Sequence, residues 1–449
     1  MESIWKSTVT IPKREALKND ITSEAVVIGA GMAGILTAYL LKEQGVHVVV
    51  LEADLIASGQ TGNTTAKITS QHGIIYDRLL SQFGKKKAAL YAMAHEAAIA
   101  EYERIIRQKQ IRCHFERLPA YLYSTKQRER LKEEARAAET IGLPAAYLDV
   151  TELPIESAGA VRFDRQAQFH PLEFIRDLSD DLEIFERTKV LSVKENRVHT
   201  DKGDVEAEHI VIASHYPIIN IPGLYFARMH QERSYVVAYE NVPKLGGMYY
   251  GIDEGSLSLR SYENILLAGG GSHRTGQNEE GGKYDAIRQK AAQYFPAGKE
   301  IANWSAQDCM PHDGMAYIGS YSVLRPYWYV ETGYQKWGMT SAMLSAMIVR
   351  DQICGLENPY EKVFTPQRLH PVTAAGGFMQ DMAVSVKELS KGLFAPVDQE
   401  GKVLRCPHMG CRLYWNEDEQ SFDCPCHGSR FDKDGRLIDD PAQTDLTKR

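Results

Sequence analysis

The pattern of apolar and polar positions predicts a strand, a helix and a second strand near the start of the chain. Residues 24–52 begin with an apolar run that leads into glycines, continue with apolar positions at helical spacing, and end in a second apolar run closed by Glu52. This order is typical of a unit in which two parallel strands share one sheet. The segment therefore indicates an α/β domain.

Later segments predict further layers and a connection between domains. Helical, charged patterns are expected over 88–140, strands over 185–214 and 235–270, and a second strand, turn and helix over 313–355. Residues 359–392 contain proline and paired glycines with little periodicity. The linker to the rest of the chain is therefore expected there.

Composition and charge exclude several classes of protein. The 449 residues carry a formal net charge of −7, and the 52 Lys and Arg are scattered along the chain, which argues against nucleic acid as the main partner. No run of apolar residues is long enough for a transmembrane helix, and the first twenty residues do not resemble a secretory leader. These observations predict a cytoplasmic protein without a transmembrane segment.

Cysteine is distributed unevenly along the chain. Of seven cysteines, three are dispersed, whereas Cys406, Cys411, Cys424 and Cys426 lie close together near the end. In a protein expected in the cytoplasm, clustered cysteines bind a metal or do redox chemistry more often than they staple a fold. The tail therefore predicts a metal or redox site.

Three glycines form a dinucleotide-binding fingerprint between the first strand and the first helix. Gly29 permits a tight turn, Gly31 lets backbone N–H groups approach a pyrophosphate, and Gly34 lets the helix pack on the strand. Glu52, at the end of the second strand, is placed to accept hydrogen bonds from a ribose. The complete unit therefore predicts dinucleotide binding.

The segment after the second strand favours FAD over a nicotinamide cofactor. Residues 57–73 are rich in Gly and Thr, which suits a backbone-lined path for the longer dinucleotide, and no second complete glycine fingerprint follows. Here the chain resembles the D-amino-acid oxidase-like family of FAD oxidoreductases, which includes glycine and sarcosine oxidases. The resemblance rests on SIWK near the start, the fingerprint, TGNTTAKIT, DGMAYIG (313–319) and TGYQKWGMTSA (332–342).

This resemblance implies positions for the parts of FAD. The pyrophosphate and ribityl chain are expected along Ser58, Gly59, Thr64, Thr65 and Ala66. The adenine is expected near Val190, and the flavin ring above Gly338, Met339 and Thr340. A tight helix start in an apolar core is the alternative interpretation of the last three residues.

The resemblance also implies a cation near the flavin and polar residues above it. Lys336 and Lys67 are the candidates for the cation that stabilises a reduced, anionic ring, although either could be a solvent-exposed lysine. Several polar residues lie in segments that family members place over the flavin: His230, Arg233, Tyr235, Tyr250, Arg260, His273 and His312. Arg260 and His312 are the preferred substrate-binding residues, because an arginine can hold a substrate carboxylate in two hydrogen bonds. Structural polar residues of a sheet are the alternative.

The tail contains two Cys-His pairs, Cys406-Pro-His408 and Cys424-Pro-Cys426-His427. Two cysteines and two histidines at this spacing resemble a Rieske [2Fe–2S] centre, in which the cysteines hold one iron and the histidines the other. The resemblance implies Cys406 and Cys424 as ligands of the first iron, His408 and His427 as ligands of the second, and a disulfide between Cys411 and Cys426. A structural zinc site is the alternative.

Two neighbouring residues bear on the redox potential of such a cluster. Ser429 occupies the position of a hydroxyl donor that raises the potential, whereas Phe431 stands where high-potential relatives carry a tyrosine. One hydrogen bond is therefore expected to be missing. In the small domain only about twenty residues, from Val384 to Arg405, precede its first cysteine, Cys406, so this domain is expected to lean on the flavoprotein for burial.

The expected fold combines an α/β Rossmann-type FAD domain, an interleaved α+β substrate or cap domain, and a small all-β Rieske domain. The oxidoreductase is expected over 1–370, with FAD-binding parts at about 23–80, 165–220 and 310–365 and substrate parts at about 85–160 and 221–309. The linker is placed at 371–392 and the Rieske domain at 393–449.

Our hypothesis for function combines the flavin, which carries two electrons, with the iron–sulfur cluster, which carries one. We expect oxidation of an amine or amino acid by hydride transfer to flavin, with electrons leaving singly through the cluster to a one-electron carrier or quinone-like acceptor. The reverse flow is equally permitted. The alternative is an electron-transfer module without its own small-molecule substrate. A Rieske oxygenase would need a mononuclear iron site made of two His and a carboxylate, which the sequence pattern does not display.

Overall fold

A mostly parallel sheet forms the dinucleotide-binding half of the molecule. The computed structural model describes residues 2–368, 371–398 and 401–447, without the side chains of 371–378 and 380. The strand order is β16-β17-β10-β1-β2-β7, and β9 joins β8 to the edge of β10. The strands are β1 (Ile21–Ile28), β2 (Val48–Leu51), β7 (Glu183–Phe185), β8 (Val190–Lys194), β9 (Arg197–Thr200), β10 (Asp204–Ile212), β16 (Tyr317–Ser322) and β17 (Arg325–Thr332).

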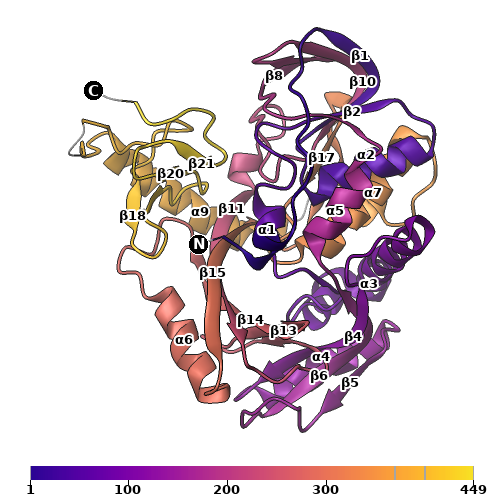
Figure 1. The fold of residues 1–449 in the computed structure, drawn as a ribbon, viewed down its shortest axis with the longest axis vertical. Coiled ribbons are helices and arrows are strands. Elements are labelled where there is room, and N and C mark those ends of the chain that lie inside the picture. The colour runs from indigo at the N-terminus through magenta and orange to yellow at the C-terminus, as the bar shows by residue number, and fades with distance from the viewer. Residues whose placement is uncertain (1, 369–370, 399–400, 448–449) are drawn as a thin grey trace.

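The strand order of this sheet brings the loops that follow several parallel strands to the same edge. β1 pairs in parallel with both β2 and β10, and β10 pairs in parallel with β17. The carboxyl ends of these strands therefore meet at one edge, where open α/β sheets bind their ligands. The sheet strands come from three separate stretches of the chain, and the intervening stretches build the second half of the molecule (Figure 1).

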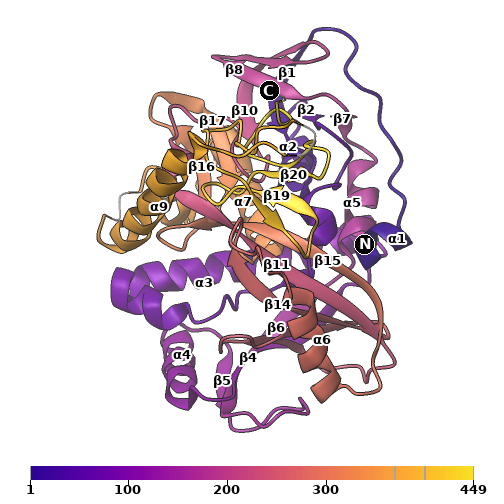
Figure 2. The same cartoon turned by 90° about the vertical axis from the view of Figure 1, so that its left-hand side faces the viewer.

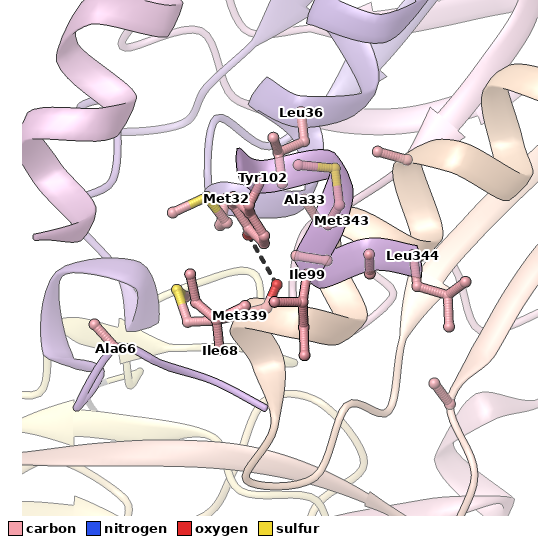
Figure 3. Close-up of a cluster of buried hydrophobic side chains, with 14 of the residues drawn as sticks. Met32, Ala33, Leu36, Ala66, Ile68, Ile99, Tyr102, Met339, Met343 and Leu344 are labelled. Carbon is pink, nitrogen blue, oxygen red and sulfur yellow. Dashed lines mark hydrogen bonds between the residues drawn. The ribbon is translucent and has the colours of Figure 1, made fainter. Parts of the chain in front are cut away.

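Apolar helices cover the sheet and form its core. Helix α2 (Met32–Glu43) is buried along most of its length and packs on α7 (Gly338–Ile353) and α5 (Pro171–Ser179). Figure 3 shows α2, α7 and α3 (Tyr76–Lys109) meeting in one cluster, in which the Tyr102 hydroxyl donates to the Met339 carbonyl oxygen at 2.8 Å. The start of α7, where the flavin ring is expected, is thus held by a buried contact.

A second, larger sheet lies below the first in Figure 1. Its order is β15-β11-β14-β13-β12-β4-β6-β3, with β5 beside β6. The strands are β3 (Lys67–Ile68), β4 (Glu116–Ser124), β5 (Ala145–Leu148), β6 (Gly159–Gln168), β11 (Met229–Glu240), β12 (Met248–Gly251), β13 (Ser258–Tyr262), β14 (Ile265–Arg274) and β15 (Lys299–Pro311). Helices α4 (Arg128–Thr140) and α6 (Lys283–Tyr294) complete this half.

The end of the chain forms a small antiparallel sheet of the order β18-β19-β20-β21. Its strands are β18 (Tyr414–Asn416), β19 (Ser421–Asp423), β20 (Arg430–Asp432) and β21 (Leu437–Asp439), and Figure 1 shows them next to β11. Short elements elsewhere are α1 (Ile4–Thr8), η1 (Gln60–Asn63), η2 (Tyr225–Ala227) and α8 (Glu361–Phe364). The expected combination of an α/β FAD domain, an interleaved second domain and a small all-β domain is therefore confirmed.

The segment expected to be a linker, 371–392, is helical. It forms α9 (Pro371–Gly392), which lies along one side of the molecule in Figure 2. The end of α9 touches the small domain so closely that a methyl group on Gly392 would lie 1.9 Å from the carbonyl oxygen of Gly410. Among the described residues, no helix combines the length and the apolar character needed to cross a membrane.

Replacement of Gly34 by alanine should destabilise the first turn of the dinucleotide fold. A methyl group there would lie 1.9 Å from the carbonyl oxygen of Gly29, a backbone atom that cannot yield without moving the strand. We expect Gly34→Ala to lower the free energy of unfolding by about 1–3 kcal/mol and to reduce bound FAD, measured by urea unfolding and flavin content. Gly269→Ala is the control, because its methyl group would be 3.6 Å from the nearest atoms. Equal stability of the two variants would contradict the prediction.

Candidate functional site

A cavity of about 1030 Å³ opens where the two large sheets and the small domain meet. It runs from the glycine turn after β1, past the loop that contains η1, to the start of α7. Ten of the residues expected from the sequence line it: Gly29, Gly31, Glu52, Ser58, Gly59, Thr64, Val190, Lys336, Gly338 and Met339. Residues of the small domain, among them Glu419, Asp439 and Asp440, close the same cavity.

The glycine turn has the geometry that a pyrophosphate requires. Gly29 has a φ of +108°, and a methyl group on it would lie 2.7 Å from the carbonyl oxygen of Ala213. Gly34 makes the closest approach of helix to strand, as expected of the third glycine. The Thr61 hydroxyl accepts a hydrogen bond from the Met32 N–H at 2.9 Å, and Gly31 places no side chain at the beginning of α2, whose dipole stabilises a phosphate. The backbone of this turn fits a dinucleotide.

Glu52 is held at the edge of the cavity by backbone groups. Its carboxylate accepts hydrogen bonds from the N–H groups of Ala30 at 2.7 Å and Asp54 at 2.8 Å. Burial raises the pKa of Glu52, although these hydrogen bonds oppose the effect. A carboxylate fixed in this way, at the end of β2, is placed to accept hydrogen bonds from a ribose.

The expected flavin end lies at the beginning of α7. Gly338 and Met339 line the cavity there, and no side chain caps the helix, so the positive end of its dipole points to the site. Thr340 does not line the cavity, because its hydroxyl accepts a hydrogen bond from the N–H of Thr69 at 2.8 Å. This contact ties α7 to the segment that carries β3.

The two candidate lysines have different environments. Lys336 lines the cavity, forms an ion pair with Glu232 at 3.2 Å and donates to the Ser272 hydroxyl at 2.7 Å. Burial opposes its charge, but Asp308 and Glu232 hold the pKa of Lys336 above its ordinary value. Lys67 instead donates to the Tyr249 carbonyl and the Ser258 hydroxyl, and burial lowers its pKa to about 7. Of the two, Lys336 is the cation that faces the cavity.

The two expected substrate-binding residues are not brought together and do not line this cavity. Arg260 is buried and donates to the carbonyl oxygens of Thr65 and Ala66, both at 2.7 Å. It therefore positions that loop, which also explains why Thr65 and Ala66 lie behind the cavity wall. His312 follows β15 and lies 3.3 Å from the carboxylate of Asp381 on α9.

Several cavity residues carry no signal in the sequence. Gln231 and Asp308 come from the paired strands β11 and β15, and Glu331 comes from the end of β17. The Glu331 Oε1 atom accepts a hydrogen bond from the Thr37 hydroxyl at 2.6 Å, and Oε2 is buried without a partner among the described residues. Burial raises the pKa of Glu331 to about 8 and that of Asp308 to about 6. No motif predicts these residues, because strand pairing alone brings them together.

The four expected cluster ligands converge in two loops of the small domain. The thiols of Cys406 and Cys424 are buried and unbridged, and the imidazole rings of His408 and His427 lie 4.9 Å apart between centroids. The Nδ1 atoms of both histidines are buried without a hydrogen-bond partner among the described residues. Burial also lowers both histidine pKa values, which favours the neutral imidazole that ligates iron. The donor set fits a two-Cys, two-His iron centre.

A disulfide joins the two cluster loops. It links Cys411 and Cys426, the pairing that the resemblance implied. Ser429 lies in the same region and hydrogen-bonds the thiol of Cys406, and the Phe431 ring is fully buried beside the cysteines. Besides that hydroxyl, backbone N–H groups of the two loops hydrogen-bond the thiols of Cys406 and Cys424.

The second cluster loop docks on the edge of the large sheet. The side-chain amide of Gln231 donates to the carbonyl oxygen of His427 at 2.7 Å, and that of Gln307 donates to Gly428 at 2.9 Å. Arg274 donates to the carbonyl oxygens of Pro425 at 2.7 Å and Cys426 at 2.9 Å. Because Gln231 also lines the cavity, one side chain separates the dinucleotide site from a cluster ligand.

A dinucleotide cavity between two sheets, closed by a small domain that carries a two-Cys, two-His centre, defines an oxidoreductase with a flavin and an iron–sulfur cluster. The model of the FAD dependent oxidoreductase family matches residues 24–352, and that of the Rieske [2Fe-2S] domain matches residues 380–448. The chain belongs to this FAD dependent oxidoreductase family and carries a C-terminal Rieske domain. Its cofactors are FAD and a [2Fe–2S] cluster, which excludes the alternative of a structural zinc site.

Three known proteins illustrate the similarity. The Bacillus subtilis protein YhfW, named as a Rieske 2Fe-2S iron-sulfur protein, is 33% identical and covers 98% of this chain and 96% of its own length. Glycine oxidase from Geobacillus kaustophilus superimposes with a TM-score of 0.65 at 18% identity, over 78% of this chain and 99% of that one. L-amino acid deaminase from Proteus vulgaris has a TM-score of 0.65 at 15% identity, over 80% of this chain and 100% of that one.

Glu331 should make the stability of the protein depend on pH. Burial raises the pKa of Glu331 from the ordinary value of 4.5 to about 8 in the folded protein. Between pH 4.5 and about 8, the folded protein therefore holds a proton on Glu331 that the unfolded chain has lost. The contribution of the neutral Glu331 carboxyl to the free energy of unfolding is complete below the ordinary pKa and is lost as pH rises through about 8. We expect the free energy of unfolding to fall by up to about 1.4 kcal/mol per pH unit in this range, and Glu331→Gln to flatten the slope.

Unfolding by urea at a series of pH values measures this effect. The exposed Glu133→Gln is the matched control and should leave the slope as it is in the native protein. A native slope that Glu331→Gln does not change would rule out Glu331 as its source.

Replacement of Phe431 by tyrosine should raise the midpoint potential of the cluster. The new hydroxyl would enter the buried surroundings of Cys406 and Cys424 and supply the hydrogen bond that is expected to be missing. Redox titration followed by the paramagnetic signal of the reduced cluster measures the change. Ser429→Ala is the opposite control and should lower the midpoint. An unchanged or lower midpoint in Phe431→Tyr would refute this account.

Proposed function

We propose that the protein oxidises a C–N bond of an amine or amino-acid-like substrate and passes the electrons singly through its Rieske cluster. When bound, FAD supplies hydride acceptance and the cluster supplies one-electron transfer. The acceptor is a one-electron carrier or a quinone-like molecule. We also propose that the protein is cytoplasmic, where burial of the disulfide between Cys411 and Cys426 shields it from cellular thiols.

The observation that carries the proposal is the hydrogen bond between Gln231 and His427. Gln231 belongs to the wall of the dinucleotide cavity, and its amide donates to the backbone of a cluster ligand at 2.7 Å. The same side chain accepts a hydrogen bond from Gln307 at 2.8 Å, so its orientation is fixed. Two redox sites separated by one buried, oriented side chain support direct electron transfer within the chain.

The choice of substrate class rests on the similar proteins. The two solved structures described above are, by their names, enzymes that act on glycine and on L-amino acids. Both are below a fifth identical to this chain, so their likeness concerns the fold, and the substrate class is carried over as part of the proposal.

Charged residues at the Lys336 end of the cavity suit an amine. Asp308 lines the cavity, and burial raises the pKa of its carboxyl to about 6 while Lys336 opposes this effect. An ammonium group must lose a proton before its carbon can release a hydride, and the Asp308 carboxylate is placed to take that proton. Lys336, held by Glu232, keeps a positive charge beside the expected flavin ring, where it favours the reduced state.

Anaerobic mixing with candidate substrates tests the proposal. The oxidised full-length protein is combined with glycine, N-methylglycine, proline, other amino acids of both hands, and simple primary amines. We expect at least one compound to bleach the flavin absorbance, followed by the paramagnetic signal of the reduced cluster. If no compound bleaches the flavin, the alternative of an electron-transfer module without its own substrate is favoured. Bleaching that never produces a reduced cluster would contradict the electron route.

Two variants separate the steps of this experiment. Cys406→Ser should abolish the cluster signal while the substrate still bleaches the flavin, because Cys406 does not line the cavity. Gln231→Leu leaves the His427 carbonyl without its donor and should weaken docking by about 1–3 kcal/mol. Because Gln231 also lines the cavity, both rates are taken per bound FAD, and cluster reduction should slow more than flavin bleaching. An unchanged rate of cluster reduction would show that the contact does not matter for transfer.

A further inference from the structure

Two histidines and an aspartate converge beside the Rieske domain, outside the dinucleotide cavity. His230 comes from β11, His312 follows β15, and Asp381 comes from α9. The Asp381 Oδ2 atom lies 2.9 Å from Nδ1 of His230 and 3.3 Å from Nδ1 of His312. One ligand atom of each side chain lies within 4.8 Å of those of the other two.

These separations are those of ligands around one metal ion. Two donors that each stand about 2.1 Å from an ion, at angles between a right angle and a tetrahedral angle, lie about 3.0–3.4 Å apart. Of the two N–O distances, 3.3 Å lies within this range and 2.9 Å lies at its lower limit. Two imidazoles and one carboxylate are also the donor set that holds a divalent metal with open coordination positions.

The surrounding residues orient all three side chains. The Nε2 atom of His230 faces the Glu232 carboxylate at 3.6 Å, and the His312 ring hydrogen-bonds the backbone carbonyl of Ala227. Arg274 holds the other oxygen of Asp381. A carboxylate or carbonyl behind each ligating histidine is what fixes its ring and tautomer in metal sites.

The cluster of side chains is accessible from one side. The exposed fractions of the side chains are 22% for His230, 14% for Asp381 and 4% for His312. An ion could therefore enter from solvent and keep water or another small molecule in its remaining positions. Arg274 connects Asp381 to the carbonyl oxygens of Pro425 and Cys426, so one side chain separates this site from the loop that carries His427.

We propose that His230, His312 and Asp381 form a mononuclear site for a divalent first-row transition metal, beside the Rieske cluster. The ion joins α9 to the second sheet. When no ion is bound, the Nδ1 protons of the histidines bridge to the Asp381 carboxylate, and the ion replaces these protons. The site is separate from the amine oxidation proposed above, and either can be present without the other.

Titration with metal ions tests this site. Untagged full-length protein with FAD and cluster in place is treated with a mild chelator, desalted, and titrated by calorimetry with Fe²⁺ under anaerobic conditions and separately with Zn²⁺. We expect one ion per chain in addition to the two irons of the cluster, confirmed by metal content after desalting. Binding should release protons, measured as a dependence of the heat on the buffer. No stoichiometric binding of either ion would overturn the proposal.

Three substitutions locate the bound ion. His230→Gln, His312→Gln and Asp381→Asn should each weaken binding by at least about tenfold, because each removes one of three ligands. His273→Gln is the matched control, since His273 is a half-buried histidine of the neighbouring strand β14 whose Nδ1 atom faces the Gly271 carbonyl. It should bind the ion as the native protein does. Bound FAD and the paramagnetic signal of the cluster verify that each variant is folded. Undiminished binding in all three variants would place the ion elsewhere and refute the site.

Discussion

A buried hydrogen bond from Gln231 to the carbonyl of His427 holds the two redox sites of this protein together. The cluster loop lies so close to β11 that a methyl group on Gly428 would be 2.6 Å from the Cβ atom of Gln231, so only glycine fits there. The same holds at Gly276, where a methyl group would be 2.6 Å from the backbone nitrogen of Pro425. Buried amide groups in this contact are costly unless they are paired, and Gln231 and Gln307 pair with each other and with the loop. The cluster loop is thus a part of the wall of the flavoprotein rather than an independent domain at the end of a tether.

Charged side chains extend this contact over the small domain. Arg233 of the large sheet is almost fully buried and pairs across the contact with Glu419 at 2.7 Å and with Asp439 at 3.7 Å. Within the small domain, Arg430 also pairs with Asp439 at 2.7 Å and fixes that carboxylate. Desolvation makes buried ion pairs poor sources of net stability, but removal of one partner leaves an unpaired buried charge. Such pairs therefore select one arrangement of the two domains over others. They also allow Asp439 and its neighbour Asp440 to serve as wall residues of the dinucleotide cavity, which the small domain could not do if it moved freely.

The sequence predicts those parts of the site that local geometry dictates. The turn around Gly29 and Gly34 and the two cysteine loops need particular residues at particular spacings, so their patterns can be recognised in a single chain. Residues that act across paired strands leave no such pattern: Gln231 and Asp308 meet only because β11 and β15 lie side by side. Arg260 looks like a substrate ligand in the sequence, whereas in the fold its guanidinium is occupied by backbone carbonyls. The helix α9 was expected as an irregular linker because its paired glycines weaken the periodic signal, and its contacts with the small domain compensate for them.

The two histidine ligands have different surroundings, and this difference bears on how a partner reaches the cluster. His427 is buried against the flavoprotein, with its carbonyl bound to Gln231 and its ring beside Phe226. His408 is only half-buried, and the residues on either side of it, Pro407 and Met409, are exposed. Its Nε2 atom hydrogen-bonds Asn220 at 3.2 Å, which fixes the ring without covering it. Within the proposed function, His408 is therefore the ligand that an acceptor can approach from solvent, whereas His427 is shielded by the flavoprotein. An acceptor that docks over Pro407 and Met409 would receive electrons through His408 while the contact between Gln231 and the His427 carbonyl stays in place.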